Sequence, residues 1–188
     1  MTEPDVNTDL LLLEKISEKD TNALSKFYDI HSRHIFSLIF YILKNESEAE
    51  DVLQEVFIQI WDKVNTYDKS LGSPISWIVK IARNKAIDRL RSKSFKKRTG
   101  ETDIERFYDI ADDSDNPEKH ADSKKHRAEI ADALKELKDD QKELIEFAYF
   151  RGYSQSELAE HFKIPLGTVK TRMRTAMMIL RNKLKHLI

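Results

Sequence analysis

Hydrophobic residues recur every three to four positions over most of the chain, and no long alternating pattern appears. This spacing predicts helices, because residues three and four apart share one face of a helix. Gly and Pro, four of each, are scarce. In the first half we expect helices over residues 9–16, 21–43, 47–64 and from 74 to at least 90. The pattern therefore predicts an all-α fold.

Capping residues indicate where these helices begin. Ser47 and Glu50 have the spacing of a capping box, in which each side chain accepts a hydrogen bond from the backbone N–H of the other residue. Ser73 is expected to cap the fourth helix, with Pro74 at its first position, where no N–H is needed. Residues 66–72, between the third and fourth helices, are predicted to form a loop.

The helical pattern fades in the middle of the chain. Acidic residues dominate there, and Asn116-Pro117 interrupts the run. Such a segment cannot bury enough apolar surface to form a core, so we predict a flexible acidic linker between two small helical domains. The expected division is an N-terminal extension (1–20), a first domain (21–98), the linker (99–123) and a second domain (124–188).

The second domain is predicted to end in a helix-turn-helix. We expect its helices over residues 124–137, 140–150, 154–162 and 167–186. Ser154 and Glu157 form another capping box, and Gly152 suits the C′ position after the second of these helices. One apolar face of the last helix should pack on the helix before it. The residues expected at this contact are Val169, Met173, Ala176, Leu180, Leu184 and Leu187 on one side and Leu158, Ala159 and Phe162 on the other.

Charge is strongly segregated although the net charge is only −1, with 32 Lys and Arg against 33 Asp and Glu. Residues 80–98 contain one acid, Asp88, and residues 163–188 contain none. For nucleic-acid binding the local field matters more than the total charge. The absence of Cys excludes disulfides, thiolate zinc sites and cysteine nucleophiles. The Leu10–Leu13 run is too short for a signal or membrane segment, so we expect a cytoplasmic protein without membrane insertion.

The basic last helix is a candidate DNA reader. A short helix that fixes a longer basic one can place side chains in the major groove. Lys and Arg neutralise phosphates, and Arg also bridges two acceptors of guanine. A solvated surface helix with no ligand is the plain alternative. The candidate contacts are Thr168, Lys170, Thr171 and Arg174, with Arg172 near the flank of the exposed face.

A second basic helix, in the first domain, combines cations with aromatic residues. Rings beside cations suit single-stranded nucleic acid, because an unstacked base can lie on a ring while its phosphates follow the charge. Trp77 would equally suit a core position, and the charge run would equally suit a solvated face. The candidate contacts are Tyr67, Lys80, Arg83, Asn84 and Arg91.

The helix that begins near Ser47 also has a candidate partner surface. Its apolar stripe leaves Asp51, Gln54, Glu55 and Ile58 pointing outwards. An apolar residue among acids and amides suggests contact with another protein, although singly exposed apolar residues are common.

Three blocks in this order resemble the extracytoplasmic-function sigma factors, the small two-domain class of bacterial transcription initiation factors. Asp51–Trp61 resembles the region that docks on the clamp helices of RNA polymerase, and Trp77–Arg91 resembles the −10 recognition helix. Gly152–Ala159 together with Pro165–Arg172 resembles the −35 reader. The resemblance covers residues 24–184.

The resemblance implies partners and roles for these residues. RNA polymerase core would contact Asp51, Gln54, Glu55 and Ile58, with Trp61 packed beneath them. The −10 element would be melted and held near Asn84, with a base captured by the loop from Tyr67 to Ser73. Lys170, Arg172 and Arg174 would enter the −35 major groove. Promoter DNA and an anti-sigma factor are the other partners that the family implies.

Two alternatives remain at this stage. The first is a stand-alone helix-turn-helix regulator that binds duplex DNA as a dimer. The second is an enzyme with a carboxylate-bridged metal, for which the candidate ligands are Glu48, Glu50, Asp51 and Glu55. Metal-binding bundles of that kind use Glu-x-x-His pairs, and none occurs here. His31 and His34 are therefore expected to be surface or packing residues, and we expect no catalytic activity, metal or cofactor.

Overall fold

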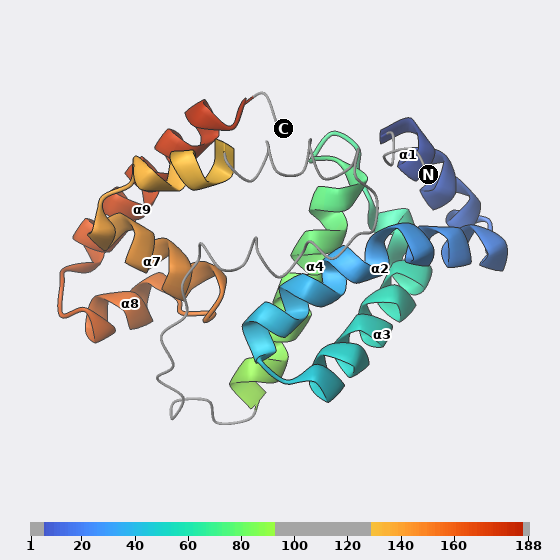
Figure 1. Cartoon of the computed structure of the whole chain (residues 1–188), viewed down its shortest axis with the longest axis horizontal. Coiled ribbons are helices and arrows are strands. Elements are labelled where there is room, and N and C mark those ends of the chain that lie inside the picture. Colours follow the sequence, from blue (N-terminus) through green and yellow to red (C-terminus); the bar gives the residue numbers. More distant parts are fainter. Residues whose placement is uncertain (1–5, 93–128, 186–188) are drawn as a thin grey trace. The chain divides into compact units, whose positions relative to one another are not determined.

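The computed structural model describes residues 6–92 and 129–185, and the chain divides into two units, 1–98 and 99–188 (Figure 1). Every regular element in the described ranges is helical, which confirms the predicted all-α fold. The predicted acidic linker, including Asn116-Pro117, lies outside the described residues. The two units are considered one at a time.

The first unit contains four α-helices and one turn of 3₁₀ helix in its described part. Their bounds are α1 Val6–Ser17, α2 Thr21–Leu43, α3 Glu46–Lys63, η1 Val64–Thr66 and α4 Pro74–Ser92. Helices α2, α3 and α4 pack against one another, and α1 lies against α2 (Figure 1). The core is formed where their apolar stripes meet. Its most deeply buried side chains include Phe27, Ile35, Ile39, Val52, Val56, Ile60 and Ile78.

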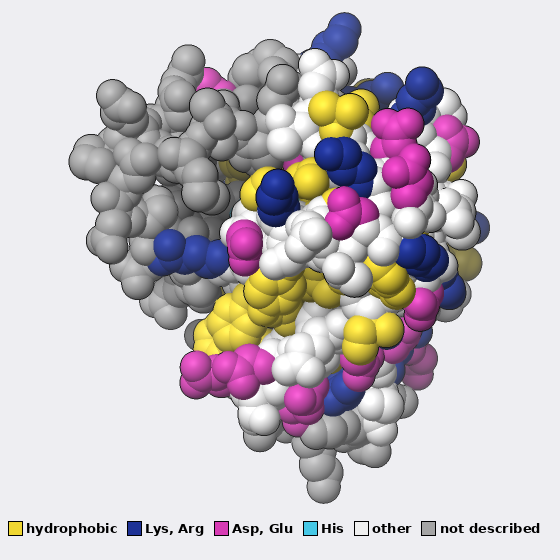
Figure 2. Space-filling model, turned by 90° about the vertical axis from the view of Figure 1, so that its right-hand side faces the viewer, with side chains coloured by type: hydrophobic (Ala, Val, Ile, Leu, Met, Phe, Trp, Pro, Cys, Tyr) yellow, Lys and Arg dark blue, Asp and Glu magenta, His cyan; other side chains and the backbone are white. Residues whose placement is uncertain are grey.

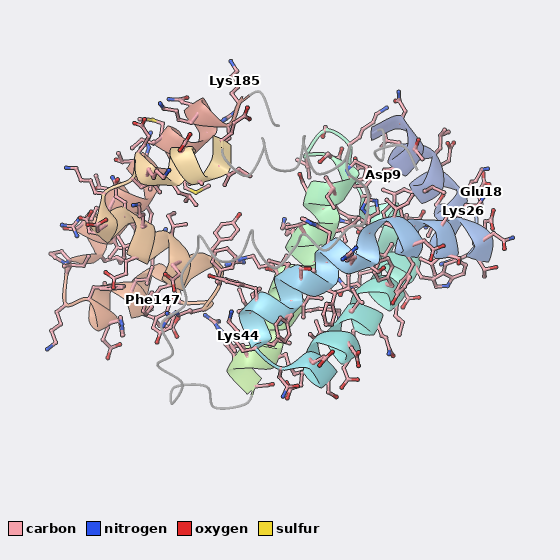
Figure 3. The ribbon with its side chains drawn as sticks, in the orientation of Figure 1. Asp9, Glu18, Lys26, Lys44, Phe147 and Lys185 are labelled. Carbon is pink, nitrogen blue, oxygen red and sulfur yellow. The ribbon has the colours of Figure 1, made fainter. Side chains whose placement is uncertain are left out.

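Helix α1 is an integral part of this unit, whereas the sequence left residues 1–20 as an extension. It starts three residues earlier than predicted, at Val6, and buries Leu13 and Ile16 against its neighbours. The buried carboxylate of Asp9 lies 2.9 Å from Nε2 of His31 on α2 (Figure 3). His31 is thus a packing residue, one of the two roles expected from the sequence. Its partner comes from a helix that the sequence pattern did not connect to it.

The start of α3 differs from the predicted capping box. Asn45, not Ser47, caps the helix, and its side-chain oxygen accepts a hydrogen bond of 3.0 Å from the backbone N–H of Glu48. The preceding Lys44 ends α2 in a left-handed conformation, with φ of 53°. The left-handed Lys44 ends α2, and Asn45 is the single extended residue before α3 begins at Glu46. Ser47 therefore already lies inside α3.

Replacing Asn45 by Ala should therefore lower the free energy of unfolding by about 1 kcal/mol, because the Asn45 side chain accepts a hydrogen bond from a backbone N–H that has no partner within the helix. Ser47→Ala is the matched control and should leave stability within about 0.5 kcal/mol. Urea denaturation of both variants measures the difference. A larger loss in Ser47→Ala than in Asn45→Ala would contradict the observed cap.

The start of α4 agrees with the sequence prediction. Pro74 is its first residue, and Oγ of Ser73 accepts a hydrogen bond of 3.4 Å from the backbone N–H of Ser76. In the loop before it, the Asp68 carboxylate accepts a bond of 2.8 Å from the N–H of Ser70. The segment between η1 and α4 is thus held by its own side chains, close to the basic helix.

The second unit contains the predicted helix-turn-helix. Residues 129–135 are helical, and they are followed by α7 Asp139–Tyr149, α8 Gln155–His161 and α9 Leu166–Lys183. The capping box of Ser154 and Glu157 is confirmed, with bonds of 3.2 and 2.7 Å. Gly152 has φ of 72° and lies two residues after the C-cap Phe150, one residue later than predicted. The start of the helix predicted over 124–137 lies outside the described residues.

Two apolar clusters hold this unit together. Leu144, Leu158 and Val169 bring one residue each from α7, α8 and α9 into a buried contact, with Met173, Ala159 and Phe162 packed around it. The other cluster contains Leu134, Leu137, Ile145 and Ala176, with Leu180 packed against it. Val169 and Met173 pack with α8 as predicted, whereas Ala176 and Leu180 pack in the cluster formed with α7 and residues 129–137. Leu184 is the C-cap residue of α9 and belongs to neither cluster, and Leu187 lies outside the described residues. Phe147, labelled on α7 in Figure 3, borders the first cluster.

Candidate nucleic-acid and partner surfaces

The exposed face of α9 carries most of the residues predicted to bind duplex DNA. Lys170, Thr171 and Arg174 are exposed, and no ion pair engages either cation within the described part of the chain. Thr171 Oγ1 donates 2.9 Å to the carbonyl of Gly167, which leaves its lone pairs as acceptors. At the helix start, the N–H of Thr168 already donates to Pro165 O at 2.8 Å. This face thus offers two exposed cationic side chains and one hydroxyl group to a ligand.

Arg172 differs from these neighbours. It is only partly exposed, and its Nη1 lies 3.0 Å from Oδ2 of Asp140 in the first turn of α7. A cation that already has a carboxylate partner must lose that contact, or share it, before it can bind a phosphate. The structure therefore separates Arg172 from the exposed cations of α9.

The basic helix of the first unit presents three of its predicted contacts on one face. Lys80, Asn84 and Arg91 are exposed and lie at intervals of four and seven residues, which places them above one another along α4. Arg83 is partly buried, and its Nη1 donates 3.3 Å to Oδ1 of Asn84. The Asn84 carbonyl oxygen thus has one lone pair left as an acceptor, and its NH₂ group adds donors.

The two aromatic candidates form one contact at the start of this helix. The rings of Tyr67 and Trp77 lie 5.5 Å apart at 59°, and both residues are half-buried. The Tyr67 hydroxyl donates 2.9 Å to the carbonyl of Gly72, which closes the loop. Burial raises the pKa of the Tyr67 phenol, and the nearby carboxylates of Asp68 and Asp9 raise it further. The phenol therefore stays protonated and keeps its donor role near neutral pH.

The outer face of α3 exposes the predicted partner residues Asp51, Gln54 and Ile58. Ile58 is 62% exposed and lies among the polar side chains of Asp51 and Gln54. On the neighbouring α2, the most exposed large apolar side chain is Tyr28, at 40%. Figure 2 views the side on which these helices lie and shows hydrophobic side chains bordered by acidic ones. Such a mixed surface suits a protein partner.

Two aromatic residues of α3, Phe57 and Trp61, are less exposed than the residues of this face. Phe57 is buried, and its ring lies 4.7 Å from that of Tyr28 on α2. Trp61 is half-buried, with Lys19 Nζ 4.8 Å from its ring centroid and 2.8 Å from its carbonyl oxygen. The sequence missed Lys19, which connects the end of α1 to the end of α3.

Glu55 lies between the partner face and the basic helix. Its carboxylate pairs with Lys85 Nζ at 3.1 Å and Arg89 Nη2 at 2.6 Å, both on α4. Burial alone would raise the pKa of Glu55, but the hydrogen bonds and charges of Lys85 and Arg89 outweigh it and hold the pKa below its ordinary value of 4.5. Glu55 therefore joins α3 to α4 and is not a free acid on the outer face.

Glu55→Gln should destabilise the first unit at neutral pH by about 0.5–1 kcal/mol, since the pair is partly exposed and screened by solvent. Because the folded pKa is lowered, the pairing stabilises the protein above the unfolded pKa and is lost as the pH falls through the folded value. The difference between wild type and Glu55→Gln should thus be constant near pH 7 and shrink below about pH 4.5. Urea titrations across this range measure it. A difference that grows with acidity would contradict the pairing.

The described ranges contain neither a candidate metal site nor a candidate membrane-spanning helix. Within residues 6–92 and 129–185, no group of three His, Asp or Glu side chains comes close enough to hold a metal ion. No helix in the same ranges combines the length and the apolar character needed to cross a membrane. The surfaces that the structure does present are charged helix faces and one mixed apolar face.

The chain resembles known proteins along almost its whole length. The model of Sigma-70 region 2 matches residues 27–96, and that of Sigma-70, region 4 matches residues 133–182. The ECF RNA polymerase sigma factor SigK of Mycobacterium ulcerans (strain Agy99) is 30% identical in an alignment of 188 positions that covers 97% of this chain and 97% of that protein. SigK of Mycobacterium sp. (strain JLS) is 31% identical over 95% of this chain and 92% of its own length.

Among solved structures, Rhodobacter sphaeroides SigE in complex with the anti-sigma ChrR is 28% identical, with 95% of this chain and 98% of that chain covered and a TM-score of 0.47. The two Sigma-70 matches fall on different units, in the order in which the basic helices occur. Together with identities of 30% or more over nearly full length, they show that the chain belongs to the ECF sigma factors of the sigma-70 family.

Proposed function

We propose that this sigma factor contacts RNA polymerase core through α3, the melted −10 strand through α4 and the −35 duplex through α9, without catalysing a reaction. The observation that carries this proposal is the outward face of α9, where Lys170, Thr171 and Arg174 are exposed opposite the buried Val169. A helix anchored on one side and basic on the other is the form that enters a major groove.

The −35 role is supported by the way α9 is held. Leu158 of α8 and Val169 of α9 are both fully buried and belong to one cluster with Leu144 of α7. This packing fixes the direction of α9, and phosphates can then be neutralised by Lys170 and Arg174. Thr168, in the first turn of α9, would contribute its hydroxyl to such a contact, since its N–H already donates to the Pro165 carbonyl.

The −10 role is supported by the combination of charge and rings in the first unit. Lys80 and Arg91 offer cations along one face of α4, and the exposed Asn84 lies between them. The contact of Tyr67 with Trp77 borders the same helix start. Unstacked bases bind to such surfaces by stacking and charge together.

The polymerase role is supported by the exposed Asp51, Gln54 and Ile58 on α3. Glu55 contributes by tying this face to α4, and Trp61 by supporting it. We place the protein in the cytoplasm because RNA polymerase core is its partner. An anti-sigma factor, implied by the family, is a further proposed partner and would compete for one of these surfaces.

In-vitro transcription with core polymerase over a library of promoter sequences tests the proposal. Wild type should initiate from a subset of the library, and both Gln54→Ala and Lys170→Ala should initiate less. Absence of initiation from every sequence would overturn the function. Tight, sequence-specific duplex binding without polymerase would instead favour a stand-alone regulator.

A further inference from the structure

Arg172 lies on the side of α9 that faces the protein. At about 100° per residue, it is about 60° from Val169 and about 160° from Arg174 around the helix. Val169 and Ala176, one turn before and one turn after it, are both fully buried. The direction of its Cα–Cβ bond is therefore towards α7, away from the face that carries Lys170 and Thr171.

The partner of Arg172 on that side is Asp140. The distance from Nη1 to Oδ2 is 3.0 Å, and the two side chains are 38% and 41% exposed. Asp140 belongs to the first turn of α7, where a carboxylate is also favoured by the free backbone N–H groups of the helix start. The pair thus joins the first turn of α7 to the recognition helix, one helical turn from Leu144 on α7 and from Val169 on α9.

We propose that Arg172 is a positioning residue of the promoter reader, which sets the orientation of α9 through Asp140 and does not neutralise a phosphate itself. This inference rests on the proposed −35 role of α9. Two clusters fix α9 through apolar contacts, which resist separation but allow small rotations. The ion pair of Arg172 with Asp140 adds an electrostatic attraction between α9 and α7, which opposes a rotation of α9 that would separate the two charges.

A cation that binds a phosphate and a cation that positions the helix affect the salt dependence of DNA binding differently. A cation that binds a phosphate releases condensed counterions, so its removal lowers the slope of log affinity against log salt by about 0.9. A cation already neutralised by Asp140 releases none when DNA binds. Removing it should weaken binding while leaving the salt slope as it was.

The test uses holoenzyme assembled from core polymerase and the full chain, on a promoter fragment found in the library experiment. Equilibrium affinity is measured over a series of salt concentrations for wild type, Arg172→Gln, Asp140→Asn, the double variant, and Lys170→Gln as the matched control for a direct phosphate contact. We expect Arg172→Gln and Asp140→Asn each to bind about two- to fivefold more weakly, the range set by a partly exposed ion pair. Their salt slopes should match wild type, whereas that of Lys170→Gln should fall by about 0.9.

The double variant distinguishes coupling from two separate effects. If the residues act as one pair, it should bind no more weakly than Arg172→Gln alone. Additive losses would overturn the proposal, and so would a salt slope for Arg172→Gln that falls as far as that of Lys170→Gln. Stronger binding by Asp140→Asn would also overturn it, because Asp140 would then be withholding Arg172 from DNA. Failure to find any promoter is a different result and counts against the proposed function.

Discussion

Leu158→Ala should unfold the helix-turn-helix or leave it only marginally stable. Leu158 is fully buried, with 0% of its surface accessible to solvent, and it packs in one cluster with Leu144 and Val169. Truncating a buried leucine costs about 2–5 kcal/mol, because the transfer energy is lost and a cavity remains. A small domain has only about 0.05–0.15 kcal/mol of stability per residue, so this loss approaches the total for the unit. Promoter binding should fall with the folded fraction.

Hydrogen exchange of the α8 and α9 amides measures this effect in the full chain, because local opening is read directly in the unit concerned. Met177→Ala is the matched control. Met177 is on α9 but is 45% exposed, so its truncation should leave exchange nearly unchanged. Equal protection in Leu158→Ala and wild type would contradict the assignment of Leu158 to the core that holds α9.

Ile58→Asn should weaken binding to core polymerase by about 30-fold, the result of losing about 2 kcal/mol at the centre of an interface. Ile58 is exposed in the free protein, so the substitution should not change folding stability by much more than helix propensity requires. In the complex, an amide would replace an apolar side chain among Asp51 and Gln54 and would need a new hydrogen-bond partner. Fluorescence anisotropy of a labelled chain titrated with core polymerase measures the affinity.

Leu11→Asn provides the control, because Leu11 is 59% exposed in the same unit but lies on α1. The same loss of apolar area there should change polymerase affinity by less than about twofold if α1 is outside the interface. Similar losses in both variants would indicate a general effect of surface polarity. Normal binding by Ile58→Asn would remove α3 from the proposed interface.

The local features of the fold were predictable because they depend on neighbours in sequence. The box of Ser154 and Glu157 and the Pro74 helix start require only a few consecutive residues, and both are observed. The misplaced cap of α3 shows the limit of this reasoning. Asn45 and Ser47 are both good capping residues, and the choice followed from the left-handed Lys44, which no side-chain pattern indicated.

The charged contacts were not predictable in the same way. The sigma-factor resemblance implied that Glu55 binds polymerase and that Arg172 binds DNA. In the structure, Glu55 pairs with two cations on α4, and Arg172 pairs with a carboxylate on α7. A signal existed for Glu55, because Lys85 and Arg89 are four residues apart and therefore project from one face of α4. Their partner could not be named before the packing of α3 on α4 was known.

The sequence by itself determined the helical class, the apolar faces and the family, because helical spacing, capping residues and the three blocks are properties of consecutive positions. The tertiary structure alone decided which charges remain available to partners. Helical spacing predicts Lys170 and Arg174 on the exposed face of α9 and Arg172 near its flank, but only the structure shows that Arg172 meets Asp140. The same holds for Asp9, whose pairing with His31 builds α1 into the first unit. The physical reason is that an ion pair depends on which helix faces meet in space, and that is fixed by the packing of the whole unit.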